Sequence, residues 1–270
     1  MGTTQPAAAT SLVLEERAGA VTTIRLNRPE KLNALNLQLA HDLVHALLRA
    51  QADRAVHCVV LTGAGRAFCA GGDLELLRDA RQRKAADEVE ALVTAGKEIS
   101  IAIATMPKVV IASVNGPAAG GGMNLALAAD IRIASDQARF AESFVQIGLF
   151  PDFGGTFFLP RIVGPTRAAE LFYTGQMLSA EEAFRLGIVG RVVPADQLEA
   201  ETKKLAESIA AGAGLAQRDV KHRMIEEQRK DLEAALDEEI RLQRHCFDSH
   251  DCLEGLNAFF EKRKPNFAGH

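Results

Sequence analysis

Two apolar segments of the chain each run into a glycine-rich loop and then into a helical pattern. The first is a strand pattern at 57–63 that leads to Gly71 and Gly72. The second is a strand pattern at 109–116 that leads to a triple glycine at 120–122. Glycine lets a backbone approach a ligand closely, and the first amides of a helix have no partner inside the helix. Two such helix starts side by side would aim two free N–H groups at one oxygen atom, the arrangement of an oxyanion hole.

Neither loop has the pattern of a nucleotide-binding loop. Gly63-Ala64-Gly65 lacks a correctly placed third glycine, and no acidic residue ends a second strand about twenty residues later. The triple glycine lacks the Lys-Ser/Thr pair of a P-loop. Tight packing explains one glycine turn, whereas two strand–glycine–helix units favour a ligand site.

Strand patterns alternate with helical patterns along the 270 residues, of which 47% are hydrophobic. This alternation predicts an α/β fold with a mainly parallel, buried sheet. Ligands of such sheets bind beyond the carboxyl ends of the strands, where both glycine loops fall. We expect a disordered tail at 1–10, one core at 11–195 and a helical C-terminal region at 196–270.

The composition argues against several classes of partner. The net charge is −4, Trp is absent and Tyr173 is the single tyrosine, which disfavours a nucleic-acid partner. We expect no membrane span, no signal peptide and a cytoplasmic protein, and the positions of the four cysteines fit that compartment. The histidines and cysteines of 245–252 lack metal-ligand spacing, so we expect no metal there but a helix end and a new helix capped by Ser249.

Asp152 is the carboxyl group with the most informative surroundings. The phenylalanines around it are Phe144, Phe150, Phe153, Phe157 and Phe158. A carboxyl group among apolar side chains is desolvated, which raises its pKa toward values useful for carrying a proton. The other interpretation makes Asp152 a helix N-cap. Glu142 is the next candidate carboxyl, with a surface role expected, and Asp73 is expected to cap the helix after the first loop.

Several stretches, in order along the chain, resemble the crotonase superfamily, the enoyl-CoA hydratase/isomerase family. They are residues 27–29, 32–35, 68–74, 115–122, 129–131, 148, 154–156, 174–175 and 259–267. The resemblance implies a crotonase-like spiral of ββα units and a homotrimer or dimer of trimers assembled through the helical region at 196–270. It also implies acyl-CoA thioester substrates, with CoA as part of the substrate and no other cofactor.

The resemblance also implies roles for individual residues. The amides of Gly72 and Gly121 would hold the thioester oxygen, where the charge of an enolate develops. Losing one such donor costs on the order of 3 kcal/mol. The residues implied to bind CoA are Leu32, Arg66, Ala70, Phe259 and Lys262, the last two at the adenine end of a neighbouring subunit's ligand.

Asn124 and Phe144 depart from the family pattern. They stand where typical hydratases hold water between two glutamates, and neither side chain acts as an acid or base. Asn124 either orients substrate by hydrogen bonding or simply packs. Asp152 stands where isomerase branches, including the ring-opening isomerase of phenylacetate degradation, have an acidic residue. We therefore expect an acyl-CoA isomerase in which Asp152 moves a proton from C2 to C4.

Two other functions fit the same residues. One is a hydratase or hydrolase-like relative whose acids are relocated, for example to Glu142. The other is a non-catalytic relative that keeps the fold and binds acyl-CoA or RNA.

Overall fold

The computed structural model describes residues 11–270, so the tail expected at 1–10 lies outside the described residues. The strands are β1 (Val13–Ala18), β2 (Val21–Leu26), β3 (Cys58–Gly63), β4 (Val109–Val114), β5 (Ala118–Ala119), β6 (Ile131–Ser135), β7 (Arg139–Ala141), β8 (Met177–Ser179) and β9 (Arg191–Val193). The first helices are α1 (Leu37–Ala52), α2 (Leu74–Arg83), α3 (Ala86–Thr105), α4 (Gly121–Ala128), α5 (Gly155–Val163) and α6 (Pro165–Thr174). They are followed by α7 (Ala180–Arg185), α8 (Leu198–Ala210), α9 (Gly214–Glu226), α10 (Arg229–Asp248) and α11 (His250–Glu261).

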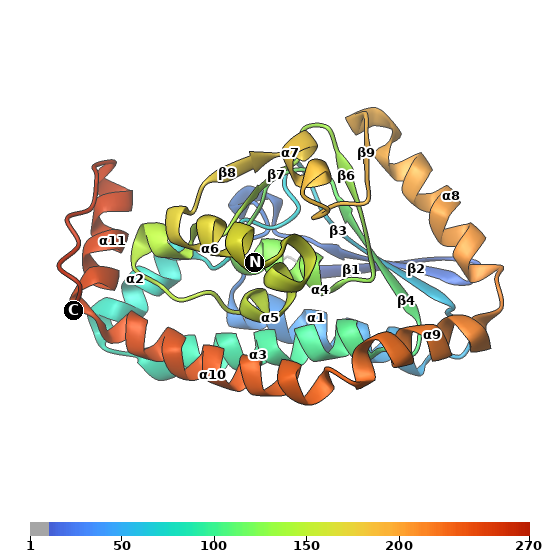
Figure 1. The fold of residues 1–270 in the computed structure, drawn as a ribbon, viewed down its shortest axis with the longest axis horizontal. Coiled ribbons are helices and arrows are strands. Elements are labelled where there is room, and N and C mark those ends of the chain that lie inside the picture. The colour runs from blue at the N-terminus through green and yellow to red at the C-terminus, as the bar shows by residue number, and fades with distance from the viewer. Residues whose placement is uncertain (1–10) are drawn as a thin grey trace, which may run out of the picture.

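The main sheet has the strand order β1-β2-β3-β4-β6-β9 (Figure 1). β1 and β2 form an antiparallel hairpin, which turns at Gly19 with φ of +61°. The other neighbours, from β2 to β9, pair in parallel. The predicted α/β class with a mainly parallel sheet is confirmed.

Helices cover both faces of this sheet. In β3, Cys58 and Val60 pack with α8, whereas Val59 and Leu61 pack in the core that contains α1 and α3. Successive side chains of a strand point to opposite faces, so a strand covered on both sides is apolar throughout. This burial explains why 58–63 reads as an unbroken apolar segment.

A smaller sheet, β5-β7-β8, follows the carboxyl end of β4. β5 pairs in parallel with β7, and isolated bridges join Leu35 to Gly72 and Cys69 to Ala118. The first bridge connects the first glycine loop to the segment before α1. The second bridge connects the same loop to β5, which directly precedes the second glycine loop. The loops therefore belong to a continuous, hydrogen-bonded framework.

The helical C-terminal region packs along the core rather than apart from it. In Figure 1, α10 runs along α3 and α11 stands beside α2. The predicted break at Ser249 is confirmed, because its hydroxyl accepts a hydrogen bond from the Cys252 amide at 3.0 Å. Between α2 and α3, Lys84 adopts a left-handed conformation that ends α2. Within the described residues, none of the helices has the length and apolar character needed to cross a membrane.

Candidate active site

The first glycine loop, at 63–72, is held in shape by the buried side chain of Asn33. Its Nδ2 donates to the carbonyl oxygens of Ala64, Ala67 and Phe68 at 2.9, 2.8 and 3.2 Å. At the end of the loop, Asp73 caps α2 as predicted, accepting from the amides of Glu75 and Leu76. The loop is therefore fixed before any ligand binds.

The second glycine loop packs backbone against backbone on the first. The Ala119 amide donates to the Cys69 carbonyl oxygen at 3.0 Å. A Cβ on Gly122 would lie 2.1 Å from that same oxygen, so the residue has to be glycine for the loops to meet. The close approach explains why the triple glycine is needed at this point of the chain.

Gly72 and Gly121 present their amides where the two loops meet. Gly121 is the first residue of α4, so its N–H has no acceptor inside the helix. Among residues 11–270, neither amide donates a hydrogen bond. Both residues line one large cavity, which makes them suitable donors to a ligand oxygen.

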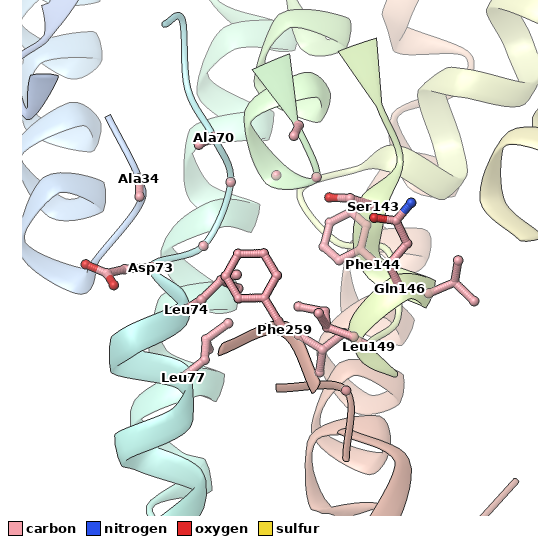
Figure 2. A pocket seen from close by; sticks show the side chains of 18 of the residues that line it. Ala34, Ala70, Asp73, Leu74, Leu77, Ser143, Phe144, Gln146, Leu149 and Phe259 are labelled. Carbon is pink, nitrogen blue, oxygen red and sulfur yellow. The ribbon is translucent and has the colours of Figure 1, made fainter. Parts of the chain in front are cut away.

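That cavity has a volume of about 1170 Å³ and opens between α2, α11 and the segment after β7. Figure 2 shows Phe259 between Leu74 and Leu77 on one side and Phe144 and Leu149 on the other. The predicted site residues that line it are Leu32, Arg66, Ala70, Gly72, Gly121, Phe144, Asp152, Phe259 and Lys262. Phe259 and Lys262 line the cavity of their own chain, and their contact with a neighbouring subunit's ligand stays a prediction.

The cavity combines three exposed cations, called the cationic rim below, with an apolar interior, and the carboxylates Glu30 and Glu75 also line it. Arg66, Lys262 and Lys264 line it, and within the described part of the chain none of the three pairs with a carboxylate. Apolar side chains of α2 and α3, including Leu77 and Val93, line the interior. Such a cavity suits a ligand with anionic groups at one end and an apolar group at the other.

Asp152 lies at the inner end of this cavity, beside Gly121. The side chain is 6% exposed, and its Oδ2 accepts from Gln243 Nε2 at 3.0 Å. Its Oδ1 has no hydrogen-bond partner among the described residues, and a Cβ on Gly121 would lie 3.4 Å from it. Burial, with the nearby Glu239 carboxyl, raises the pKa of Asp152 to about 8, although the Gln243 hydrogen bond opposes this rise.

The alternative interpretation of Asp152 as a helix N-cap is wrong. Helix α5 begins after Gly154, which has φ of +85° and no capping side chain. A residue of another helix accepts from the amides at the start of α5. Glu239 of α10 accepts from the amides of Gly154 and Thr156 at 2.8 and 3.0 Å. The carboxyl of Asp152 is thus free of a structural capping role.

Asn124 does not line the cavity. The side chain is fully buried behind it, and Nδ2 donates to the backbone oxygen of Asp152 at 2.8 Å. A Cβ on Gly155 would lie 2.4 Å from that nitrogen, so Asn124 packs directly on the start of α5. The packing interpretation therefore describes this residue, and it supports the Asp152 loop rather than touching the cavity.

Glu142 is not on the surface, contrary to the expectation. It follows β7, whose pairing with β5 and β8 carries it inward, and it is 1% exposed. Burial and the neighbouring Asp152 raise its pKa well above the usual value, with the Asn124 amide opposing them. The Asn124 amide is near enough to act on the Glu142 carboxyl but forms no hydrogen bond of normal geometry with it, so both side-chain oxygens lack a partner among the described residues. Glu142 does not line the cavity.

Glu239 and Gln243 are site residues that the sequence analysis missed. They stand one turn apart on the buried side of α10, in line with Leu232, Leu236 and Phe247. Polar residues on the apolar stripe of an amphipathic helix were the signal that could have found them. Their partners lie about ninety residues earlier, which one sequence does not show.

Replacing Glu239 with alanine is expected to destabilise the protein by about 3 kcal/mol or more. The Gly154 and Thr156 amides and the Thr156 hydroxyl all lose their acceptor, and an unsatisfied buried polar group costs about 1–3 kcal/mol. Urea unfolding measures the loss. Glu239→Gln keeps one acceptor oxygen and should lose less, whereas equal stability of Glu239→Ala and wild type would contradict the capping role.

Known proteins resemble this chain over nearly its whole length. The family model described as "Enoyl-CoA hydratase/isomerase" matches residues 16–270. The chain is 38% identical to "Crotonyl-CoA hydratase" of Syntrophomonas wolfei, over 94% of this chain and 97% of that protein. It is also 38% identical to "1,2-epoxyphenylacetyl-CoA isomerase" of Escherichia coli, over 95% and 98%. The crystal structure of an enoyl-CoA hydratase from Bacillus halodurans is similar, with a TM-score of 0.87, 29% identity and coverage of 92% and 100%.

Proposed function

The chain belongs to the enoyl-CoA hydratase/isomerase family, and we propose that within this family it is an acyl-CoA isomerase with Asp152 as its proton carrier. The observation that carries the proposal is the unpartnered Oδ1 of Asp152 beside Gly121, in a cavity lined by both free loop amides. A base and an oxygen-binding pair are the two elements needed to form an enolate.

The proposed reaction moves one double bond. Ionised Asp152 takes a proton from C2 of a 3-enoyl thioester, and the electron pair of the broken C–H bond forms a C1–C2 double bond. Negative charge moves onto the thioester oxygen, where the N–H groups of Gly72 and Gly121 donate. The charge then returns to restore the C1–O double bond, and the electron pair of the C1–C2 double bond moves to form the C2–C3 double bond. The electron pair of the former C3–C4 double bond forms a C–H bond at C4 with the proton held by Asp152, which becomes ionised again.

The cavity supports an acyl-CoA as substrate. The cations Arg66, Lys262 and Lys264 suit the phosphates of CoA, which would enter as part of the substrate. The apolar interior suits an unsaturated acyl tail or an aryl ring. Opening of an aryl epoxide ring on such a thioester is therefore a second isomerisation that the same carboxyl and amides could serve.

Hydration by the usual two carboxylates has less support. Phe144 fills one of the expected positions, and Asn124, at the other, is committed to the Asp152 backbone. Glu142, the relocated acid considered above, lies outside the cavity lining. Asp152 is thus the carboxyl best placed to contact the acyl group.

The direct assay supplies the purified protein with a 3-enoyl-CoA and with crotonyl-CoA. The proposal predicts conversion of the 3-enoyl-CoA to the conjugated 2-enoyl-CoA, and slow or undetectable hydration of crotonyl-CoA. Hydration at a comparable kcat/KM would identify a hydratase instead. Binding of both thioesters without turnover would identify a non-catalytic relative.

The rate of isomerisation should rise with pH. Since the pKa of Asp152 is raised to about 8, the protonated form dominates below that pH and cannot accept the C2 proton. We expect kcat/KM to fall about tenfold per unit below about pH 8 and to level off above it. A profile that is flat between about pH 6 and 9 would contradict an ionisable base of this pKa.

We also propose that the chain assembles as a homotrimer or a dimer of trimers, as the family resemblance implies. Light scattering on the eluted peak of a sizing column measures the mass, and a monomer would contradict this proposal.

A further inference from the structure

We propose that Gln243 is a positioning residue that fixes the Asp152 carboxyl group with Oδ1 toward the substrate. This inference rests on the proposed function, and it names a residue of α10 as part of the same site. Gln243 is 3% exposed and lines the cavity.

The orientation of the Gln243 amide follows from its two partners. Its Oε1 accepts from the backbone amide of Phe150 at 2.9 Å, and a backbone N–H is always a donor. The oxygen therefore faces Phe150, and Nε2 has to face Asp152, to which it donates at 3.0 Å. One side chain thus holds two points of the loop, two residues apart.

This arrangement makes the two oxygens of Asp152 different. Oδ2 is occupied by the Gln243 hydrogen bond, whereas Oδ1 has no donor and lies against Gly121. A donor to a carboxylate stabilises its ionised form, while burial and the Glu239 carboxyl of α10 favour the protonated form. Glu142, which follows β7, is the other carboxyl that interacts with Asp152, and burial together with Asp152 raises the pKa of Glu142 well above its usual value. Gln243 therefore acts against the two influences that would leave Asp152 permanently protonated.

The rest of the loop is fixed from other directions. Phe153 has a positive φ of +54°, an unfavourable conformation for a side chain of this size. Ser100 donates to the Phe153 carbonyl oxygen at 2.8 Å, and Glu239 accepts from the Gly154 amide. With the backbone held in this way, the donor from Gln243 remains as the contact that acts on the Asp152 carboxyl itself.

The test is the titration of Asp152 in the free, folded protein. Carbon NMR of aspartate labelled at the carboxyl carbon follows it, with the Asp152 signal identified by its absence in Asp152→Asn. In Gln243→Leu we expect the titration midpoint of Asp152 to rise by about one to two pH units. The pH at which kcat/KM levels off should rise by the same amount. KM should change little, because the substituted side chain keeps its volume.

Two further variants separate positioning from structural support. Gln243→Glu keeps an acceptor for the Phe150 amide but places a second carboxyl beside Asp152, so the profile should again shift upward. Gln146→Leu removes another glutamine of the same cavity, whose Nε2 donates to the Gly175 carbonyl oxygen, and should leave the Asp152 midpoint unchanged.

The outcomes distinguish this inference from the proposed function. An unchanged Asp152 midpoint in folded Gln243→Leu overturns the positioning role even if Asp152 proves essential. A shifted midpoint in Gln243→Leu, together with full activity of Asp152→Asn, would keep the positioning role and remove the proposed mechanism.

Discussion

Asp152→Asn is expected to lower kcat/KM for the double-bond shift by a factor of about 10²–10⁴. Asparagine has nearly the same shape and can still accept from Gln243 through its side-chain oxygen, but it cannot take the C2 proton. The affinity for an acyl-CoA should change little, because the cationic rim and the loop amides remain. Steady-state kinetics with a 3-enoyl-CoA and calorimetric binding of a saturated acyl-CoA measure the two effects.

The same substitution should make the protein more stable at high pH. The folded pKa of Asp152, about 8, lies above the ordinary value of 3.8, so folding favours the protonated carboxyl. The contribution of Asp152 to the free energy of unfolding is therefore fully present below about pH 4. It is lost as the pH rises toward 8, which lowers the stability of the wild type by several kcal/mol at most. Asparagine has no such dependence. Urea unfolding at both ends of this range should show a gain for Asp152→Asn that grows with pH.

An Asp152→Asn variant that retains wild-type kcat would contradict the mechanism. A variant that loses activity but gains no stability at pH 8 would contradict the conclusion that burial raises the pKa of Asp152 in the folded protein.

Gly121→Pro is expected to lower kcat by a factor of at least about 10²–10³, the usual effect of losing one oxyanion-hole donor. Gly121 is the first residue of α4, a position that tolerates proline because its N–H has no helical acceptor. Proline removes that N–H and puts its ring where the substrate oxygen would lie.

Gly121→Ala is the matched control. It keeps the N–H and adds a Cβ that would lie 3.3 Å from Phe153 and 3.4 Å from Leu35 and from Asp152 Oδ1. These contacts require small shifts, so a moderate loss of kcat is expected. The difference in kcat between the two variants measures the effect of removing the Gly121 N–H. Equal kcat values would argue against a role for that N–H.

The frame of the site could be predicted from local sequence. Buried parallel strands read as unbroken apolar segments, and glycines mark the points where the two loop backbones touch, as at Gly122. The desolvation of Asp152 was also predictable from the phenylalanines around it, and the direction of the pKa change is confirmed. These features depend on residues near one another in the chain.

The partners of Asp152 could not be predicted in the same way. Gln243 lies 91 residues away in the sequence and reaches the site only because α10 packs along α3. Glu142 was expected to have a surface role because its position lies off the usual one of the family, yet the pairing of β7 on both sides carries it into the interior. Both outcomes depend on how elements distant in sequence pack together.

The central claim, that one carboxyl group carries the proton from C2 to C4, is tested most directly by isotope transfer. A 3-enoyl-CoA with deuterium in place of both C2 hydrogens is converted in ordinary water, and the product is analysed by NMR. Because Asp152 is buried, we predict deuterium at C4 in a measurable fraction of the product. Hydrogen at C4 derived wholly from water would contradict a proton shuttle by Asp152.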